Sequence, residues 1–437
     1  MALLATLVAV IATGSGGAEA QAANQTKPGP LSGLALPPDP GPITKVEKPA
    51  PDFSANTAHY GLAAFEIIGF EILLNQVNRH YLTPEYKSNL RSIRKNLRSG
   101  WVVDDDPFTT NQLGHPYAGS MYHGFAGSAG LNFWESLGYT FAGSALWEIA
   151  GETSTPSRND QIATGIGGSF FGEALFRLSS LMIDQGGVTP PLWREIAAAA
   201  IAPSAGFNRH ALRERGYVKF DSHDPAYYIR LQLGFSGAVK NNEGTSLAKL
   251  SRNEILGDFS IDYGLPGKRG YTYERPFDYF NLQATASSAN GFENLMTRGM
   301  LIGKAHAEGA NYRGIFGLFG SYDYIAPQIF RVSSTALSLG ATGEYRISDV
   351  IAAQGSFLLG VGYAAVGTTR GAYNETNYHY GVAPQMLIAG RMLFGQNASL
   401  DLTAREYFVS SSGTGHDNIV RVDASWTYPC TPATASP

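Results

Sequence analysis

The residues best suited to chemistry gather in one segment of the chain. His115 can serve as a base near neutral pH or as a metal ligand, and carboxylates follow it at Glu148, Glu152 and Asp160. The residues around them are rich in Gly and Ala, and an unpaired buried charge in such surroundings is costly. We therefore predict that the four side chains lie close together in space.

Three interpretations of this cluster are open. In the first, the four side chains form a polar network that cross-links close-packed helices and has no chemical role. In the second, His115 is a general base, Glu148 or Asp160 orients it, and a hydroxyl group or water is the nucleophile. In the third, the cluster holds a divalent cation. Oxygen ligands suit calcium or magnesium, whereas the imidazole favours zinc or manganese, and no H-E-x-x-H motif identifies the metal.

Further polar residues of the same segment are candidates for binding a ligand, because they supply amide, hydroxyl, carboxylate and guanidinium groups. They are Asn111, Tyr117, Glu152, Ser157, Asn159 and Arg177. Glu148 and Glu152 are four positions apart and share one helix face if the helix continues through Gly151. Glu173 and Arg177 have the same spacing, which predicts an ion pair.

The elements that carry these residues are predicted to form a helical domain over residues 54–220. Apolar residues recur at helical spacing in 55–82. In 116–152, glycines three to five positions apart would let helices approach closely. Either Ser157 or Asn159 is expected to cap a helix that runs to about Ile183.

Residues 225–428 change from helical periodicity to alternation. In 227–236 the odd positions are apolar and the even positions are polar or small, and about ten such segments of roughly ten residues follow each other. A soluble sandwich also alternates, but it normally brings more Lys and Glu to its solvent face. The sequence therefore predicts an α+β chain in which the helical domain precedes an antiparallel outer-membrane-type β-barrel of about 10–12 strands.

The alternation also predicts which strand residues face lipid and which face the lumen. The outward set is Leu231, Leu233, Phe259, Ile261, Leu400 and Leu402. The inward set is Arg230, Gln232, Asp258 and Asp401. A barrel of this size has a narrow lumen, so we expect the helices either to cap its periplasmic mouth or to pack partly into it.

Composition and the N-terminus agree with export. Only 16% of residues are charged, the net charge is −4, and nothing favours nucleic acid as a partner. Residues 1–22 resemble a signal peptide, with an apolar run before the cleavage-site-like Ala18-Glu19-Ala20. Residues 23–53 contain eight prolines and are predicted to form an extended linker. Cys430 is the only cysteine, which excludes an intramolecular disulfide and a lipoprotein anchor at the cleavage site.

The motifs of the chain resemble a bacterial family of unknown function, DUF3943. The resemblance is carried by 111–122, Phe133-Trp134, 147–152, Pro156-Ser157-Arg158-Asn159-Asp160, 203–209 and 322–331. It covers most of residues 55–430. Because no activity is established for the family, the resemblance implies an envelope location and no mechanism.

Together these observations predict an exported outer-membrane protein of a Gram-negative bacterium with a structural or binding role. Membrane lipid is its expected partner, and a small polar solute or a lipid is its candidate ligand. The alternative is an envelope hydrolase that modifies lipid or glycan, with the His/carboxylate site at the helix–barrel junction. Perturbed pKa values of His115 and Glu148 facing a cleft would favour the enzyme, whereas full mutual hydrogen bonding would favour the scaffold.

Overall fold

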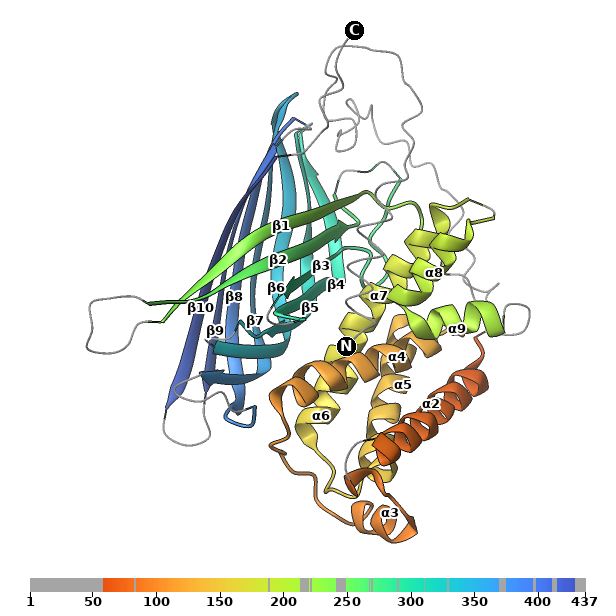
Figure 1. Cartoon of the computed structure of the whole chain (residues 1–437). Helices are drawn as coiled ribbons and strands as arrows, with labels where there is room; N and C mark the ends of the chain where they lie inside the picture. The colour runs from red at the N-terminus through yellow and green to blue at the C-terminus, as the bar shows by residue number, and fades with distance from the viewer. Residues whose placement is uncertain are drawn as a thin grey trace.

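The computed structural model places a helical part before a β-barrel, so the α+β architecture predicted from the sequence is confirmed (Figure 1). It describes residues 58–428 except 82–83, 188, 213–219, 221, 241–248, 267, 269, 289–290, 310, 328–329, 369–374, 396–397 and 411–414. The expected signal peptide (1–22) and linker (23–53) lie outside the described residues, as does Cys430.

Ten strands in the described part form one antiparallel sheet in sequence order, each paired with the next. They are β1 (Tyr227–Lys240), β2 (Lys249–Tyr263), β3 (Phe280–Ser287), β4 (Asn294–Glu308), β5 (Tyr312–Ile325), β6 (Phe330–Ser348), β7 (Ile351–Thr368), β8 (His379–Phe394), β9 (Ala398–Ser410) and β10 (His416–Thr427). The sheet curls into a nearly closed barrel. Within the described residues β1 and β10 share no backbone ladder, and Gln232 donates a hydrogen bond to Thr427 across this seam (2.7 Å).

The period-two alternation separates the two faces of the barrel wall. Charged and amide side chains line an internal cavity of about 600 Å³, among them Arg230, Gln232, Asp258 and Asp401 as predicted. Apolar side chains project from the outer face, and Leu231, Leu233, Leu400 and Leu402 are exposed there. Phe259 and Ile261 also belong to the outward set, but both are buried. The prediction that these two residues face lipid is wrong, because helices cover this part of the wall.

The helical part contains eight α-helices and four short segments of other helical types in the described residues. The α-helices are α2 (Tyr60–Tyr81), α3 (Leu90–Asn96), α4 (His115–Ser128), α5 (Phe133–Leu146), α6 (Arg158–Ile162), α7 (Gly168–Asp184), α8 (Leu192–Ile201) and α9 (Pro203–Ala211). The others are the 3₁₀ turn η3 (Pro84–Tyr86) and the π-helical turns η4 (Thr110–Gly114), η5 (Trp147–Gly151) and η6 (Ala163–Gly167). Glycine allows the central helices to touch: a Cβ atom at Gly168 would lie 2.6 Å from the Cα atom of Gly119.

The helices pack against the outside of the barrel, on one side of it (Figure 1). Phe170 of α7 covers Gly320 of β5, where a Cβ atom would lie 2.5 Å from the Phe170 ring. Phe170 and Phe171 share one apolar core with the outward-facing Phe259 and Tyr322. The expectation that helices cap or enter the lumen is therefore wrong. Their apolar faces gain burial against the aromatic outer wall, whereas the charged lumen offers no such contact.

A candidate site at the helix–barrel junction

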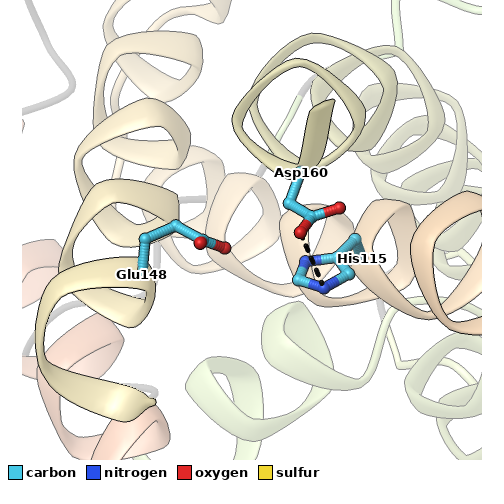
Figure 2. Close-up of side chains that lie close together, drawn as sticks. All are labelled: His115, Glu148 and Asp160. Carbon is cyan, nitrogen blue, oxygen red and sulfur yellow. Dashed lines mark ion pairs between the residues drawn. The ribbon is translucent and has the colours of Figure 1, made fainter. Parts of the chain in front are cut away.

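Three of the four clustered residues converge in the folded chain (Figure 2). His115 begins α4, Glu148 lies in η5 and Asp160 lies in α6. One potential ligand atom of each lies within 4.8 Å of the others. His115 Nε2 and Asp160 Oδ2 are 3.8 Å apart. We refer to His115, Glu148 and Asp160 as the His115 cluster.

Local structure positions these side chains. The N-cap of α6 is Ser157, one of the two residues that the sequence offered for this role, and its Oγ accepts a hydrogen bond from the backbone N–H of Asp160. The backbone N–H of Ser157 donates to Glu148 Oε2 (2.8 Å), which links the start of α6 to η5. At Gly151 a Cβ atom would lie 2.6 Å from the Trp147 ring, so the π-helical turn depends on glycine there.

Glu152 does not join the cluster. The chain leaves the helix after Gly151, and Glu152 has an extended backbone (φ −124°, ψ 163°). Its carboxylate accepts hydrogen bonds from Trp147 Nε1 (2.6 Å) and Ser154 Oγ (2.9 Å). The prediction that Glu148 and Glu152 share one helix face is therefore wrong, because the π-helical turn ends the helix between them.

Hydrogen bonds with neighbouring residues reach every member of the His115 cluster. His115 Nδ1 lies 3.1 Å from Thr164 Oγ1, and Asp160 Oδ1 accepts from the side chain of Asn159 (3.1 Å). Glu148 Oε2 accepts from Ser157, as described above. Glu148 Oε1 is buried and has no hydrogen-bond partner among the described residues. Mutual hydrogen bonding within the cluster is therefore incomplete.

A ring of polar side chains surrounds the cluster and reaches the barrel. Asp104 accepts from the side-chain amides of Asn111 (2.6 Å) and Asn159 (2.8 Å). Asn159 also donates to the hydroxyl of Tyr380 on β8 (2.8 Å), and Gln112 donates to the same hydroxyl (2.9 Å). The predicted binding residues Asn111, Ser157 and Asn159 thus lie beside the cluster. In the sequence, Asp104 belongs to an acidic run that could bind a cation but is typical of a solvated turn, and nothing placed it at the cluster. Sequence reasoning missed Tyr380, which is distant in sequence and follows no motif.

Burial sets the protonation of the cluster. It lowers the pKa of His115 to about 4. Burial, assisted by the Glu152 carboxylate, raises the pKa of Glu148 to about 9. Burial and the Asp104 carboxylate hold the pKa of Asp160 well above its usual range. At neutral pH the side chains of His115 and Glu148 are therefore uncharged. Burial opposes ionisation of Asp104 as well, but hydrogen bonds from Asp160, Asn159 and Asn111 lower its pKa.

The remaining predicted site residues lie elsewhere. Tyr117 is half-buried on α4 and packs against two apolar clusters. Arg177 on α7 forms the predicted ion pair with Glu173 (2.7 Å) and a second one with Asp278 in the connection between β2 and β3 (2.8 Å). His123 Nε2 lies 3.1 Å from the Glu173 carboxylate. We refer to His123, Glu173, Arg177 and Asp278 as the Arg177 cluster.

Comparison with known families identifies the segment that carries the site. Residues 100–204 match the family model described as a domain of unknown function (DUF3943). The resemblance predicted from the motifs is confirmed over these residues, and the whole His115 cluster falls within them. No curated protein and no solved structure matches the chain.

Proposed function

We propose that this β-barrel protein with a DUF3943 segment is an outer-membrane protein of a Gram-negative envelope, exported by a cleaved signal peptide, with a structural or ligand-binding role. The observation that carries the proposal is the reversed polarity of the barrel wall. The lumen holds the charges, while the wall exposes apolar side chains. Water disfavours such a surface and lipid accommodates it.

The exposed apolar face extends over the strands that the helices leave uncovered. It includes Leu233 on β1, Leu339 on β6, Leu359 on β7, Ile388 on β8, Leu402 on β9 and Val422 on β10. Contiguous apolar surface of this extent is unusual on a soluble monomer. Trp426 and Tyr428 are exposed near the end of β10, where aromatic residues suit a membrane–water interface.

Helix α2 supports contact with lipid in the helical part as well. By length and composition it is apolar enough to cross a membrane, and most of its surface is not buried in the protein. Phe65, Ile72 and Leu73 are all more than half exposed on it. A helix with this exposed face suits a position next to acyl chains.

The binding part of the proposal rests on the lumen. Its cavity of about 600 Å³ falls in the range of small-molecule sites. Arg391 bridges Asp262 and Asp401 there, and Arg230 pairs with Asp401 (2.9 Å). Charges of both signs suit a small polar solute or a lipid head group better than an apolar ligand.

The proposal is tested by substitution on the two faces of one strand. Leu402→Arg places a charge on the exposed outer face, and we expect it to lower stability in membranes by about 2–4 kcal/mol near the midplane. Thr403→Arg is the matched control, because Thr403 lines the lumen and pairs across the sheet with Asp423. The wild type should fractionate with outer membranes, resist carbonate extraction and show heat-modifiable gel mobility. Recovery in the soluble periplasm, or equal tolerance of both substitutions, would contradict the proposal.

A hydrolase is the second candidate function. Three neighbouring side chains could act as a catalytic triad, with Thr164 as the nucleophile, His115 as the base and Asp160 as the acid that orients it. Thr164 Oγ1 lies 3.1 Å from His115 Nδ1, and Asp160 lies beyond the other ring nitrogen. Thr164 is only 2% exposed, so a substrate would need the helices to open. Hydrolysis of phospholipid vesicles that is lost in Thr164→Val and kept in Thr164→Ser would favour this candidate over the binding role.

A further inference from the structure

We infer that His115, Glu148 and Asp160 bind a divalent cation of the first transition series, which ties α4, η5 and α6 together. The three side chains come from three separate elements and point toward one another (Figure 2). Their potential ligand atoms lie within 4.8 Å of one another. An ion at their centre would contact all three elements at once.

The spacing suits an ion better than a direct hydrogen bond. His115 Nε2 and Asp160 Oδ2 are 3.8 Å apart, which is beyond hydrogen-bond distance. Two ligands about 2.1 Å from a tetrahedral zinc ion lie about 3.4 Å from each other. A closing movement of a few tenths of an ångström would therefore bring this pair to ligand spacing.

The outer contacts orient the ligand atoms. When His115 Nδ1–H donates to Thr164, the lone pair is on Nε2, the nitrogen that faces Asp160. Metal-binding histidines usually donate their second nitrogen to an oxygen in this way. Ser157 likewise holds one oxygen of Glu148 and leaves Oε1 buried without a partner among the described residues. Because Glu148 is 98% buried, its Oε1 is a polar atom inside the protein that can bind a cation in the cluster.

The charges of the donor groups suit the same ion. A divalent cation with two carboxylates and one neutral imidazole forms an uncharged assembly, and metal binding normally releases the protons that such ligands hold.

The donor set selects the kind of cation. Calcium takes six to eight oxygen ligands, and magnesium keeps several waters in an octahedral shell. An imidazole nitrogen with two carboxylates suits zinc, manganese or another ion of that series. We therefore use Zn²⁺ as the probe and Ca²⁺ and Mg²⁺ as competitors.

The test uses the full-length protein in detergent, stripped with a chelator and equilibrated with Zn²⁺. We expect one tightly bound ion per chain by elemental analysis, and loss of that ion in His115→Gln and Glu148→Gln. Glu152→Gln is the matched control, because its carboxylate binds Trp147 and Ser154 instead. Thr164→Val should weaken binding about 10–100-fold through the lost outer contact.

Two further measurements control for variants that do not fold. Heat-modifiable mobility shows whether each variant keeps its barrel, and visible absorption of a Co²⁺ complex of the wild type reports the ligands if a variant does not fold. Zn²⁺ retention that is equal in wild type and Glu148→Gln would overturn the inference. So would displacement of Zn²⁺ by equimolar Ca²⁺ or Mg²⁺, or a wild type that binds no metal. None of these results depends on the location of the protein, so the outer-membrane proposal is tested separately.

Discussion

The helical part contains two buried clusters of ionisable side chains, and they differ in one respect. Both take a histidine from α4, and both combine it with carboxylates. The Arg177 cluster also contains a guanidinium group, which lies between Glu173 and Asp278. The His115 cluster contains no Lys or Arg among its three members. One cluster therefore has its own cation, and the other does not.

Protonation follows from this difference. Burial would raise the pKa of Glu173, but Arg177 and His123 together lower it to about 2, so this carboxylate is charged. Burial raises the pKa of Glu148 to about 9, so this carboxyl group is neutral. Because the two glutamates lie in the same helical part, the comparison indicates that an internal cation, and not burial alone, decides their charge.

The largest effect is expected when the internal cation is removed. Arg177→Met leaves Glu173 and Asp278 buried without their partner, and losing one side of a buried ion pair costs about 3–5 kcal/mol. Chemical denaturation of the folded protein measures this loss. Arg194→Met is the control, since Arg194 lies over the Trp193 ring and belongs to neither cluster. A loss for Arg177→Met no larger than that for the control would show that the Arg177 cluster contributes little to stability.

The second prediction is that the two clusters make the stability of the fold depend on pH in opposite directions. Between its usual pKa of 4.5 and about 9, Glu148 holds its proton in the folded state but not in the unfolded state. The metal-free protein should therefore lose stability as pH rises through this range, by at most about 1.4 kcal/mol per pH unit from this group. For Glu173 the pKa is lowered, so stability should be lost as pH falls from 4.5 toward about 2.

The variant Glu148→Gln separates the contribution of Glu148 to the pH dependence of stability from the contributions of other titrating groups. The variant keeps the shape of the protonated side chain and removes the titration, so the slope between pH 5 and pH 9 should decrease in thermal denaturation of the metal-free protein. Glu195→Gln is the control, because Glu195 pairs with Arg209 near the surface. An unchanged slope in Glu148→Gln would mean that Glu148 is ionised in the folded protein.

The smallest effect is expected at the edge of the His115 cluster. Thr164→Val removes the hydrogen bond to His115 Nδ1 and should destabilise the metal-free protein by about 1 kcal/mol. Thermal denaturation with and without Zn²⁺ distinguishes this cost in stability from the role of Thr164 in orienting His115 toward the metal ion. If Thr164 only stabilises the helices, the loss should be the same in both conditions.

The sequence predicts those features that depend on local pattern. Alternation separated the lumen residue Arg230 from the outward-facing Leu231, and the i, i+4 spacing of Glu173 and Arg177 predicted their ion pair. The convergence of His115, Glu148 and Asp160 followed from the cost of burying charges in a Gly- and Ala-rich segment. These inferences need no knowledge of distant contacts.

Other features depend on tertiary structure and could not be predicted. The π-helical turn that directs Glu152 away from the cluster follows no local sequence pattern. Tyr380 reaches the site from a strand that is far along the chain, and its alternation pattern is the same as that of a lipid-facing residue. Phe259 shows the same ambiguity, because an outward apolar side chain can meet either lipid or a helix.

The central claim is that the His115 cluster holds protons in place of a cation. Calorimetric titration of the metal-free, full-length protein with Zn²⁺, in buffers that differ in ionisation enthalpy, counts the protons released at neutral pH. We predict that Zn²⁺ binding to the wild type releases the proton of Glu148, and that Glu148→Gln, which lacks this ligand, gives neither the binding nor the release. Zn²⁺ binding with no proton release, or with the same release in the wild type and Glu148→Gln, would contradict the account.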